Sequence, residues 1–184
     1  MFKIIKEKEP EFFKDYKRKF KPFSWKDYSY EIKQELKNYM FEKEQGYFCP
    51  YCELVINLEN SQIEHIKPKD KFPKLTGEYS NYLVGCTNPT TCGQHKKNIW
   101  SDNFINPTVE NPEDYLTYDI MTGEIVPKEN FGMKYEKAKE TINILNLNNK
   151  KLCEARRTLI LNKEYIDFFE NFPSLKEYLK KNFL

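Results

Sequence analysis

The sequence predicts a mainly helical α+β protein in three parts, on three observations. Apolar residues recur at helical spacing near both ends of the chain. Residues 115–127 have the pattern of a hairpin, and an irregular middle segment holds four of the five cysteines and both histidines. We place the parts at 1–46, 47–110 and 111–184, and we expect one compact unit, since 184 residues can bury a sizeable core.

The first part is expected to consist of packing helices. Ser24-Trp25-Lys26-Asp27 resembles a capping box, with Asp in place of the usual Glu. We expect Gly46 to end the following helix near residue 45, because glycine adopts the left-handed conformation of a helix C-cap. The apolar side chains at helical spacing are Trp25, Tyr28, Ile32, Leu36 and Tyr39.

Two cysteine pairs in the middle part indicate a metal site. The CPYC sequence of residues 49–52 is a C-x₂-C knuckle, a spacing that lets two thiolates face one zinc ion, and Cys86 and Cys92 can complete a tetrahedron. The spacing of this second pair is looser, so a rival set replaces Cys86 with His95. The alternative is a set of small buried thiols, which we prefer for the isolated Cys153. The preferred zinc ligands are Cys49, Cys52, Cys86 and Cys92.

The third part is expected to contain one hairpin and three helices. Gly123 would close the hairpin turn, Asn146–Asn149 would separate the first two helices, and Pro173 would precede the last. Arg156 and Arg157 are expected to be solvated or paired with acidic residues. The expected elements are a hairpin over 115–127 and helices over 134–147, 150–170 and Ser174–Asn182.

Positive charge is unevenly distributed, although the formal net charge of +2 is too small to indicate a nucleic-acid-binding protein. Residues 1–26 carry nine Lys or Arg against four acidic residues, and residues 62–98 carry six Lys against three. Such an excess can bind phosphate, but we favour a solvated surface for residues 1–26. No apolar run has the length of a signal peptide or a membrane span, so we expect a cytoplasmic protein with reduced thiols and no membrane contact.

The QIEHIKPK sequence of residues 62–69 places an acid and a base inside a strand-like run. Burying Glu64 or His65 without a partner costs on the order of several kcal/mol. In isolation such a pair is more often a surface salt bridge or a satisfied histidine. Its position between two cysteine pairs, before Asn81 and His95, favours a functional site instead.

Taken together, these motifs resemble the HNH endonuclease family. The succession runs CPYCE, IEHIKPK, NYLVGC, CGQHK, FINP, TGEIVP and LNLNNKKL. Over about residues 45–160 it is similar to the HNH nuclease subunits of Septu-type bacterial defence systems, which also accompany some retrons. The resemblance implies a ββα-metal core, in which two strands and a helix surround one divalent cation with a zinc knuckle beneath. N-terminal helices and the C-terminal hairpin and helices would flank this core.

The resemblance also implies roles for single residues. His65 would act as the general base, because an imidazole near its normal pKa suits that role at neutral pH. Asn81 would brace the loop of residues 67–80, since an amide donates and accepts hydrogen bonds at once. Glu64 and His95 would hold the catalytic Mg²⁺ or Mn²⁺. The lysines expected to bind nucleic-acid phosphates are Lys67, Lys96 and Lys97.

Two positions depart from the family pattern. The family more often has Asp or His where this chain has Glu64, and it usually has His or Asn where this chain has Gly93. Asn98 is therefore kept as an alternative to His95, above all if His95 binds zinc.

The resemblance implies a metal-dependent endonuclease that hydrolyses DNA in an anti-phage defence system, with an ATPase as partner protein. The missing His or Asn after Cys92 motivates one alternative, a zinc-stapled nucleic-acid-binding module without catalysis. A second alternative is an interaction subunit whose activity requires its partner.

Overall fold

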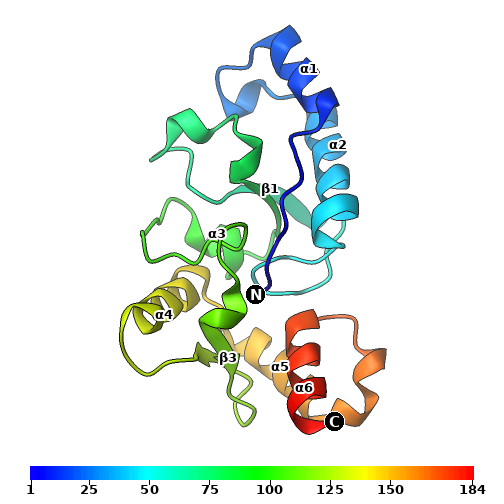
Figure 1. Cartoon of the computed structure of the whole chain (residues 1–184). Coiled ribbons are helices and arrows are strands. Elements are labelled where there is room, and N and C mark those ends of the chain that lie inside the picture. Colours follow the sequence, from blue (N-terminus) through cyan, green and yellow to red (C-terminus); the bar gives the residue numbers. More distant parts are fainter.

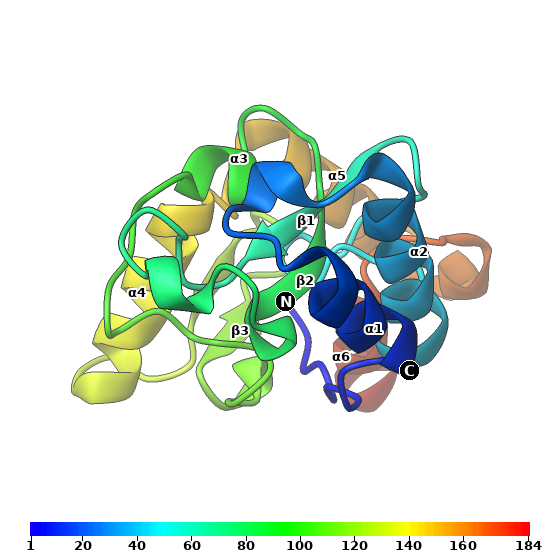
Figure 2. The ribbon, with the colours of Figure 1, turned by 90° about the horizontal axis from the view of Figure 1, so that it is seen from above.

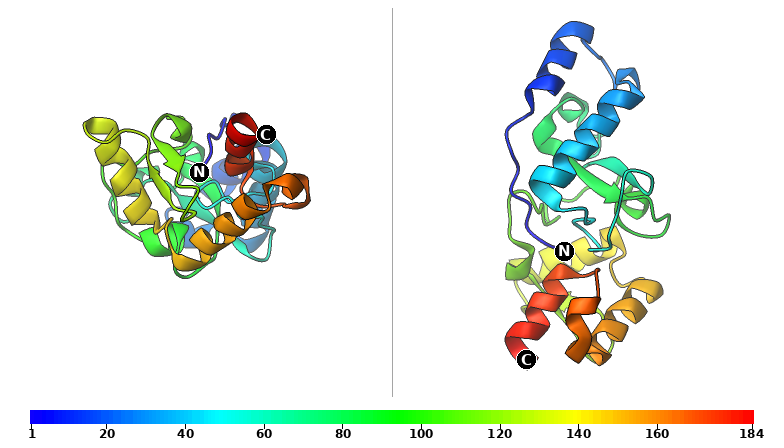
Figure 3. Two further views of the ribbon diagram at one scale, coloured as in Figure 1. Left: turned by 90° about the horizontal axis from the view of Figure 1, so that it is seen from below. Right: turned by 90° about the vertical axis from the view of Figure 1, so that its right-hand side faces the viewer.

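Two small antiparallel sheets lie between two groups of helices in the computed structural model, which describes residues 1–184 (Figure 1). Views at right angles to one another show the N-terminal helices at one end of the long axis and the last helices at the other (Figures 1 and 3). The predicted α+β class, with helix predominating, is confirmed. None of the helices combines the length and the apolarity needed to cross a bilayer.

The capping box predicted at Ser24 and Asp27 is present, but it caps only one short turn. The chain is then extended at Tyr28, because the ring of Tyr28 is buried against Phe13, with ring centroids 5.6 Å apart. A second N-cap, Ser29, therefore starts the long helix. The N-terminal elements are α1 (Glu11–Phe20), the 3₁₀ turn η1 (Trp25–Asp27), α2 (Tyr30–Met40) and the π-helical turn η2 (Phe41–Gln45).

Gly46 ends this helical segment, as the sequence predicts, with a φ of 62°. Just before it, the Gln45 side chain forms two hydrogen bonds with the backbone of Val84: Oε1 accepts from the N–H at 2.8 Å and Nε2 donates to the carbonyl at 2.9 Å. Lys37 is buried and donates from Nζ to two backbone carbonyls next to the first strand, at 2.5 and 3.1 Å. These polar contacts fix α2 beside the first sheet.

The first sheet and the short helix after it follow one another in the order strand, strand, helix. The antiparallel register places Glu64 opposite Leu83 and His65 opposite Tyr82. α2 lies on one side of the first strand and the short helix on the other (Figure 2). The elements are β1 (Ser61–His65), β2 (Tyr82–Cys86) and α3 (Cys92–Lys96).

The third part contains the predicted hairpin, with Gly123 at a φ of 76°, and the predicted turn at Asn146–Asn149. The helix expected over 150–170 is shorter and ends at Leu161. The backbone leaves the helical conformation at Asn162, which has a φ of −111° and a ψ of 32°. The elements are η5 (Pro112–Asp114), β3 (Leu116–Tyr118), β4 (Ile125–Pro127), α4 (Met133–Leu145), α5 (Lys150–Leu161), η6 (Lys163–Phe168) and α6 (Pro173–Phe183).

Arg156 is buried, which corrects the expectation of a solvated or acid-paired side chain. Its Nε donates to the carbonyl of Gly123 at 2.6 Å, and Nη2 donates to the carbonyl of Leu147 at 2.7 Å. These carbonyls replace water as acceptors for Nε and Nη2, while Nη1 is buried without a hydrogen-bond partner. Arg156 therefore ties α5 to the hairpin turn, whereas Arg157 is exposed as expected.

Glu53, directly after the cysteine knuckle, connects the N-terminal segment, the hairpin and α6. Its carboxylate is buried and pairs with the α-ammonium of Met1. It also accepts from the backbone N–H of Ser174 at 2.8 Å, from the Ser174 hydroxyl at 2.5 Å and from the Tyr118 hydroxyl at 3.3 Å. Burial favours the neutral form, but the ammonium group and the Ser174 donors outweigh it and hold the pKa of Glu53 below its usual value.

We predict that Glu53→Gln lowers the free energy of unfolding by about 3 kcal/mol, because a neutral amide leaves the buried donors poorly matched. Urea unfolding at neutral pH measures this loss. Since the folded pKa of Glu53 is lowered, its contribution is present above the unfolded pKa and disappears as pH falls through the folded pKa. The same change at the exposed Glu59 is the control, with an effect below about 0.5 kcal/mol. Equal stability of the two variants would contradict the assignment.

Candidate functional site

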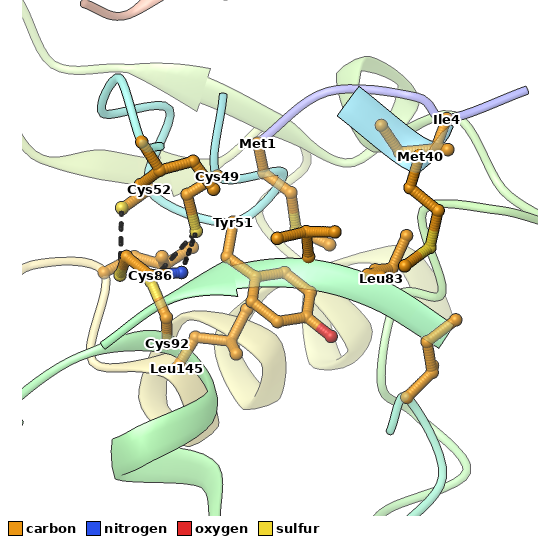
Figure 4. Close-up of a cluster of buried hydrophobic side chains, with 14 of the residues drawn as sticks. Met1, Ile4, Met40, Cys49, Tyr51, Cys52, Leu83, Cys86, Cys92 and Leu145 are labelled. Carbon is orange, nitrogen blue, oxygen red and sulfur yellow. Dashed lines mark hydrogen bonds between the residues drawn. The ribbon is translucent and has the colours of Figure 1, made fainter. Parts of the chain in front are cut away.

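Four cysteine side chains meet in the interior, where three segments converge (Figure 4). Cys49 and Cys52 come from the loop after η2, Cys86 ends β2 and Cys92 starts α3. Their Sγ atoms all lie within 4.8 Å of one another, and all four residues are buried. This is the set preferred from the sequence, and the rival ligand His95 does not belong to it.

The separations of these sulfur atoms fit one tetrahedral metal ion. Cys49 Sγ lies 3.8 Å from Cys92 Sγ, and Cys52 Sγ lies 3.8 Å from Cys86 Sγ. A regular tetrahedron with metal–sulfur bonds of about 2.3 Å has sulfur–sulfur separations of about 3.8 Å. Burial raises the pKa of the Cys92 thiol, and a bound cation would reverse this by stabilising the thiolate. The cluster can therefore hold a metal ion, as predicted.

A polar pocket of about 420 Å³ lies between α2 and the end of α3, and both members of the Glu-His pair line it. β1 supplies Glu64 and His65, while α3 and the residues after it supply Gly93, Lys97 and Asn98. The pocket therefore brings together residues that are far apart in the sequence, and it is separate from the sulfur atoms of the cysteine cluster.

His65 ends β1 and is held by packing and by one hydrogen bond. Its ring meets Trp25 edge to face at 4.8 Å, and its Nε2 lies 3.2 Å from the carbonyl oxygen of Thr76. A carbonyl can only accept, so the proton sits on Nε2 and Nδ1 keeps the lone pair. Burial lowers the pKa of His65 to about 4, well below the normal value expected from the sequence, so the ring is neutral at pH 7. A neutral imidazole with a free Nδ1 lone pair can accept a proton.

The sequence did not single out either of these two partners of His65. Trp25 appeared only as one member of an apolar series on a helix, and nothing distinguished it from a core residue. Thr76 contributes a backbone carbonyl, which leaves no signal in the sequence. Only the tertiary arrangement shows that the loop after β1 returns to the imidazole.

Asn81 braces that loop. Its Oδ1 accepts from the N–H of Lys67 at 2.8 Å, and its Nδ2 donates to the carbonyls of Lys67 and Leu75 at 3.0 and 3.3 Å. These bonds reach both ends of the segment that carries the Thr76 carbonyl. Asn81 is therefore placed where it can orient His65 through the loop, while its part in catalysis stays a prediction.

Glu64 is buried beside an ammonium group. Lys96 Nζ lies 2.8 Å from Glu64 Oε1 and donates to the carbonyl of His65 at 3.1 Å, and Lys96 is only 1% exposed. Burial raises the pKa of Glu64, while the Lys96 charge opposes this rise. Oε1 is therefore held in a buried ion pair. Lys96, expected to meet phosphate, thus faces inward.

Gly93 lies directly against the Glu64 carboxylate. A Cβ at residue 93 would come within 2.3 Å of Glu64 Oε2, so a larger residue there would require the carboxylate to move. The long Glu64 side chain fills the space that a side chain at residue 93 would need. The two departures from the family pattern are therefore neighbours in this structure, with the Glu64 carboxylate packed against Gly93.

His95 and Asn98 are the two candidates for the ligand that would hold the catalytic ion together with Glu64, and their side chains point to different places. His95 Nδ1 lies 2.9 Å from the carbonyl oxygen of Ile144 in α4, and His95 does not line the pocket. Asn98 does line the pocket, and its Nδ2 donates to Asp70 at 2.6 Å. The structure thus brings Asn98, rather than His95, to the Glu-His pair.

The three lysines expected to bind phosphate lie in three different environments. Lys97 is exposed at the pocket, and Lys96 is buried. Lys67 Nζ lies over the rings of Phe72 and Trp100, at 5.2 and 5.3 Å from their centroids. Of the three, only Lys97 lines the pocket that also contains Glu64 and His65.

Known proteins provide an independent comparison, although no protein-family model matches the chain. The chain is 38% identical over 135 residues to a Vibrio cholerae protein named as a candidate HNH endonuclease of retron Vc95, covering 66% of this chain and 62% of that protein. It is 28% identical over 160 residues to the Escherichia coli counterpart named for retron Ec83, covering 64% and 61%. It is 29% identical over 136 residues to the Septu protein PtuB of Bacillus thuringiensis, covering 67% and 48%.

These matches confirm the resemblance that the motifs indicated. The matched regions span between about half and three fifths of the length of the curated relatives.

We predict that the purified protein contains one metal ion per chain, bound by four thiolates. Cys52→Ser should release the ion and lower the melting temperature, because three remaining ligands hold a tetrahedral ion poorly. Inductively coupled plasma mass spectrometry measures the metal content. Cys153→Ser is the control and should keep the ion, since Cys153 lies outside the cluster. Full metal content in Cys52→Ser, or none in the wild type, would exclude the site.

Proposed function

Because the chain is homologous to HNH endonucleases of the retron and Septu type, we propose that it hydrolyses phosphodiester bonds in DNA as part of an anti-phage defence system. The observation that carries this proposal is the pocket in which His65 and Glu64 meet. The His65 ring is neutral and oriented there, and the Glu64 carboxylate lies beside it, paired with Lys96.

His65 is the general base of this proposal. The Thr76 carbonyl fixes the Nε2–H tautomer, so Nδ1 accepts the proton of the attacking water. Asn81 acts through the loop, because its amide holds the segment that presents the Thr76 carbonyl. Trp25 limits rotation of the imidazole by packing against its face.

Glu64 and Asn98 are the side chains that would hold a divalent cation in the pocket. Both offer the hard oxygen atoms that Mg²⁺ and Mn²⁺ prefer. When bound, the cation supplies charge neutralisation at the scissile phosphate and assistance to the leaving oxygen. We choose Asn98 over His95, since the pocket includes Asn98 and the Nδ1 of His95 is engaged by α4.

Zinc is the ion proposed for the cysteine cluster, because four thiolates in a closed, buried site suit structural zinc. We place the protein in the cytoplasm, where its thiols remain reduced. An ATPase encoded beside it is the proposed partner, by analogy with the defence systems after which its relatives are named. If the isolated chain cleaves DNA as fast as other nucleases of this kind do, its activity does not require that partner.

A second candidate function is nucleic-acid binding without catalysis. The Lys96 ammonium favours it, because a positive charge 2.8 Å from Glu64 Oε1 disfavours a second cation at the same carboxylate. This module would bind nucleic acid with a steep salt dependence and would not cleave it, whichever divalent metal is added.

We predict that His65→Ala abolishes nicking of supercoiled plasmid in Mg²⁺ or Mn²⁺, with a loss of at least about 10²-fold, because the proton acceptor is gone. Unchanged circular dichroism and metal content would show that the variant remains folded. Plasmid nicking by His65→Ala at the wild-type rate would rule out this base. Absence of nicking in the wild type would favour the binding module.

The choice of Asn98 over His95 as a ligand of the divalent cation has its own test. Asn98→Ala is predicted to raise the Mn²⁺ concentration for half-maximal nicking by about tenfold, since it removes an oxygen from the pocket. His95→Ala is the matched comparison and should leave that concentration unchanged, because its ring faces α4. The reverse result, with His95→Ala shifted and Asn98→Ala unaffected, would restore His95 as the ligand.

A further inference from the structure

One face of α2 forms one wall of the pocket, and α3 lies on the opposite side. Tyr30, Lys33, Gln34 and Lys37 all line it, at the spacing that places residues on one side of a helix. Gln45 and Lys37 fix α2 to the first sheet, so this wall is held at a defined distance from the Glu-His pair. The N-terminal helices were expected only to pack, yet α2 belongs to the pocket.

Three lysines from three different segments surround this pocket without a carboxylate partner. Lys33 lies on α2, Lys69 on the loop after β1 and Lys97 after α3. None of them forms an ion pair. Burial and the positive charge of Lys69 lower the pKa of Lys33. The one carboxylate that lines the pocket, Glu64, is already paired with Lys96. The pocket thus has unneutralised positive charge.

Aromatic side chains accompany these lysines on the α2 side. Tyr30 lines the pocket and is 71% exposed. Lys33 Nζ lies over the Trp25 ring, 5.0 Å from its centroid. The Tyr30 ring contributes little to packing, because water covers most of its surface.

We propose that this pocket binds a single-stranded segment of nucleic acid, with phosphates at Lys33, Lys69 and Lys97 and a base stacked on Tyr30. The inference rests on the proposed function and names the form of its substrate. Single-strand-binding proteins combine a basic groove with aromatic rings on which bases stack. In a duplex the bases are already stacked on one another, so Tyr30 would find no base face.

Binding of labelled oligonucleotides by the full chain tests this inference. Fluorescence anisotropy compares one short mixed sequence as single-stranded DNA, as single-stranded RNA and as duplex DNA, without divalent cations so that nothing is cleaved. We expect at least about fivefold tighter binding to a single strand than to the duplex. The two single strands distinguish DNA from RNA, and a preference for either supports the inference. Equal or tighter binding to the duplex would overturn it.

Variants of the α2 wall test the residues. Lys33→Gln should weaken single-strand binding and reduce the slope of log affinity against log salt by about 0.7. Lys43→Gln is the matched control with the same charge change, since Lys43 is exposed, unpaired and outside the pocket. Tyr30→Ala should weaken single-strand binding at least about fivefold, whereas Tyr30→Phe keeps the ring and should bind as the wild type does.

The variants also separate this inference from the proposed function. Binding is measured without catalysis, so a wild type that binds a single strand but never cleaves would defeat the nuclease and leave the inference standing. Equal binding by Lys33→Gln and Lys43→Gln, or by Tyr30→Ala and Tyr30→Phe, would overturn the inference even if the protein is an active nuclease.

Discussion

The convergence of four sulfur atoms is the interaction on which the middle of this protein depends. Cys49 and Cys52 lie on an irregular loop, Cys86 ends a five-residue strand and Cys92 begins a five-residue helix. Segments this short gain little from their own hydrogen bonds, and a two-stranded sheet is marginal in water. One ion shared by the four thiolates would fix the strands and the helix together, and with them the pocket beside β1.

The pocket combines a firmly held imidazole with a closely packed carboxylate. The Thr76 carbonyl and the Trp25 ring leave the imidazole of His65 one tautomer and little freedom. Glu64, by contrast, shares its buried space with the Lys96 ammonium and with the backbone of Gly93. The Glu64 carboxylate occupies the space beside Gly93, and the Lys96 charge offsets burial of the carboxylate.

Much of this arrangement could be predicted from the sequence, because it rests on local chemistry. The C-x₂-C knuckle, the Gly46 helix end, the Gly123 hairpin turn and the Asn146–Asn149 turn each reflect a residue type suited to one geometry. The burial of Arg156 could not be predicted, since its partners are carbonyls from distant turns. For the same reason the sequence could not choose between His95 and Asn98, or show that α2 faces the pocket.

The central claim is that two kinds of ion occupy two separate places in this chain, and anomalous diffraction tests it most directly. Crystals of the protein soaked in Mn²⁺ would be measured at the zinc and manganese absorption edges. The account predicts a zinc peak inside the four cysteine sulfurs and a manganese peak beside the Glu64 and Asn98 oxygens. A manganese peak at the cysteines, or none in the pocket next to His65, would contradict it.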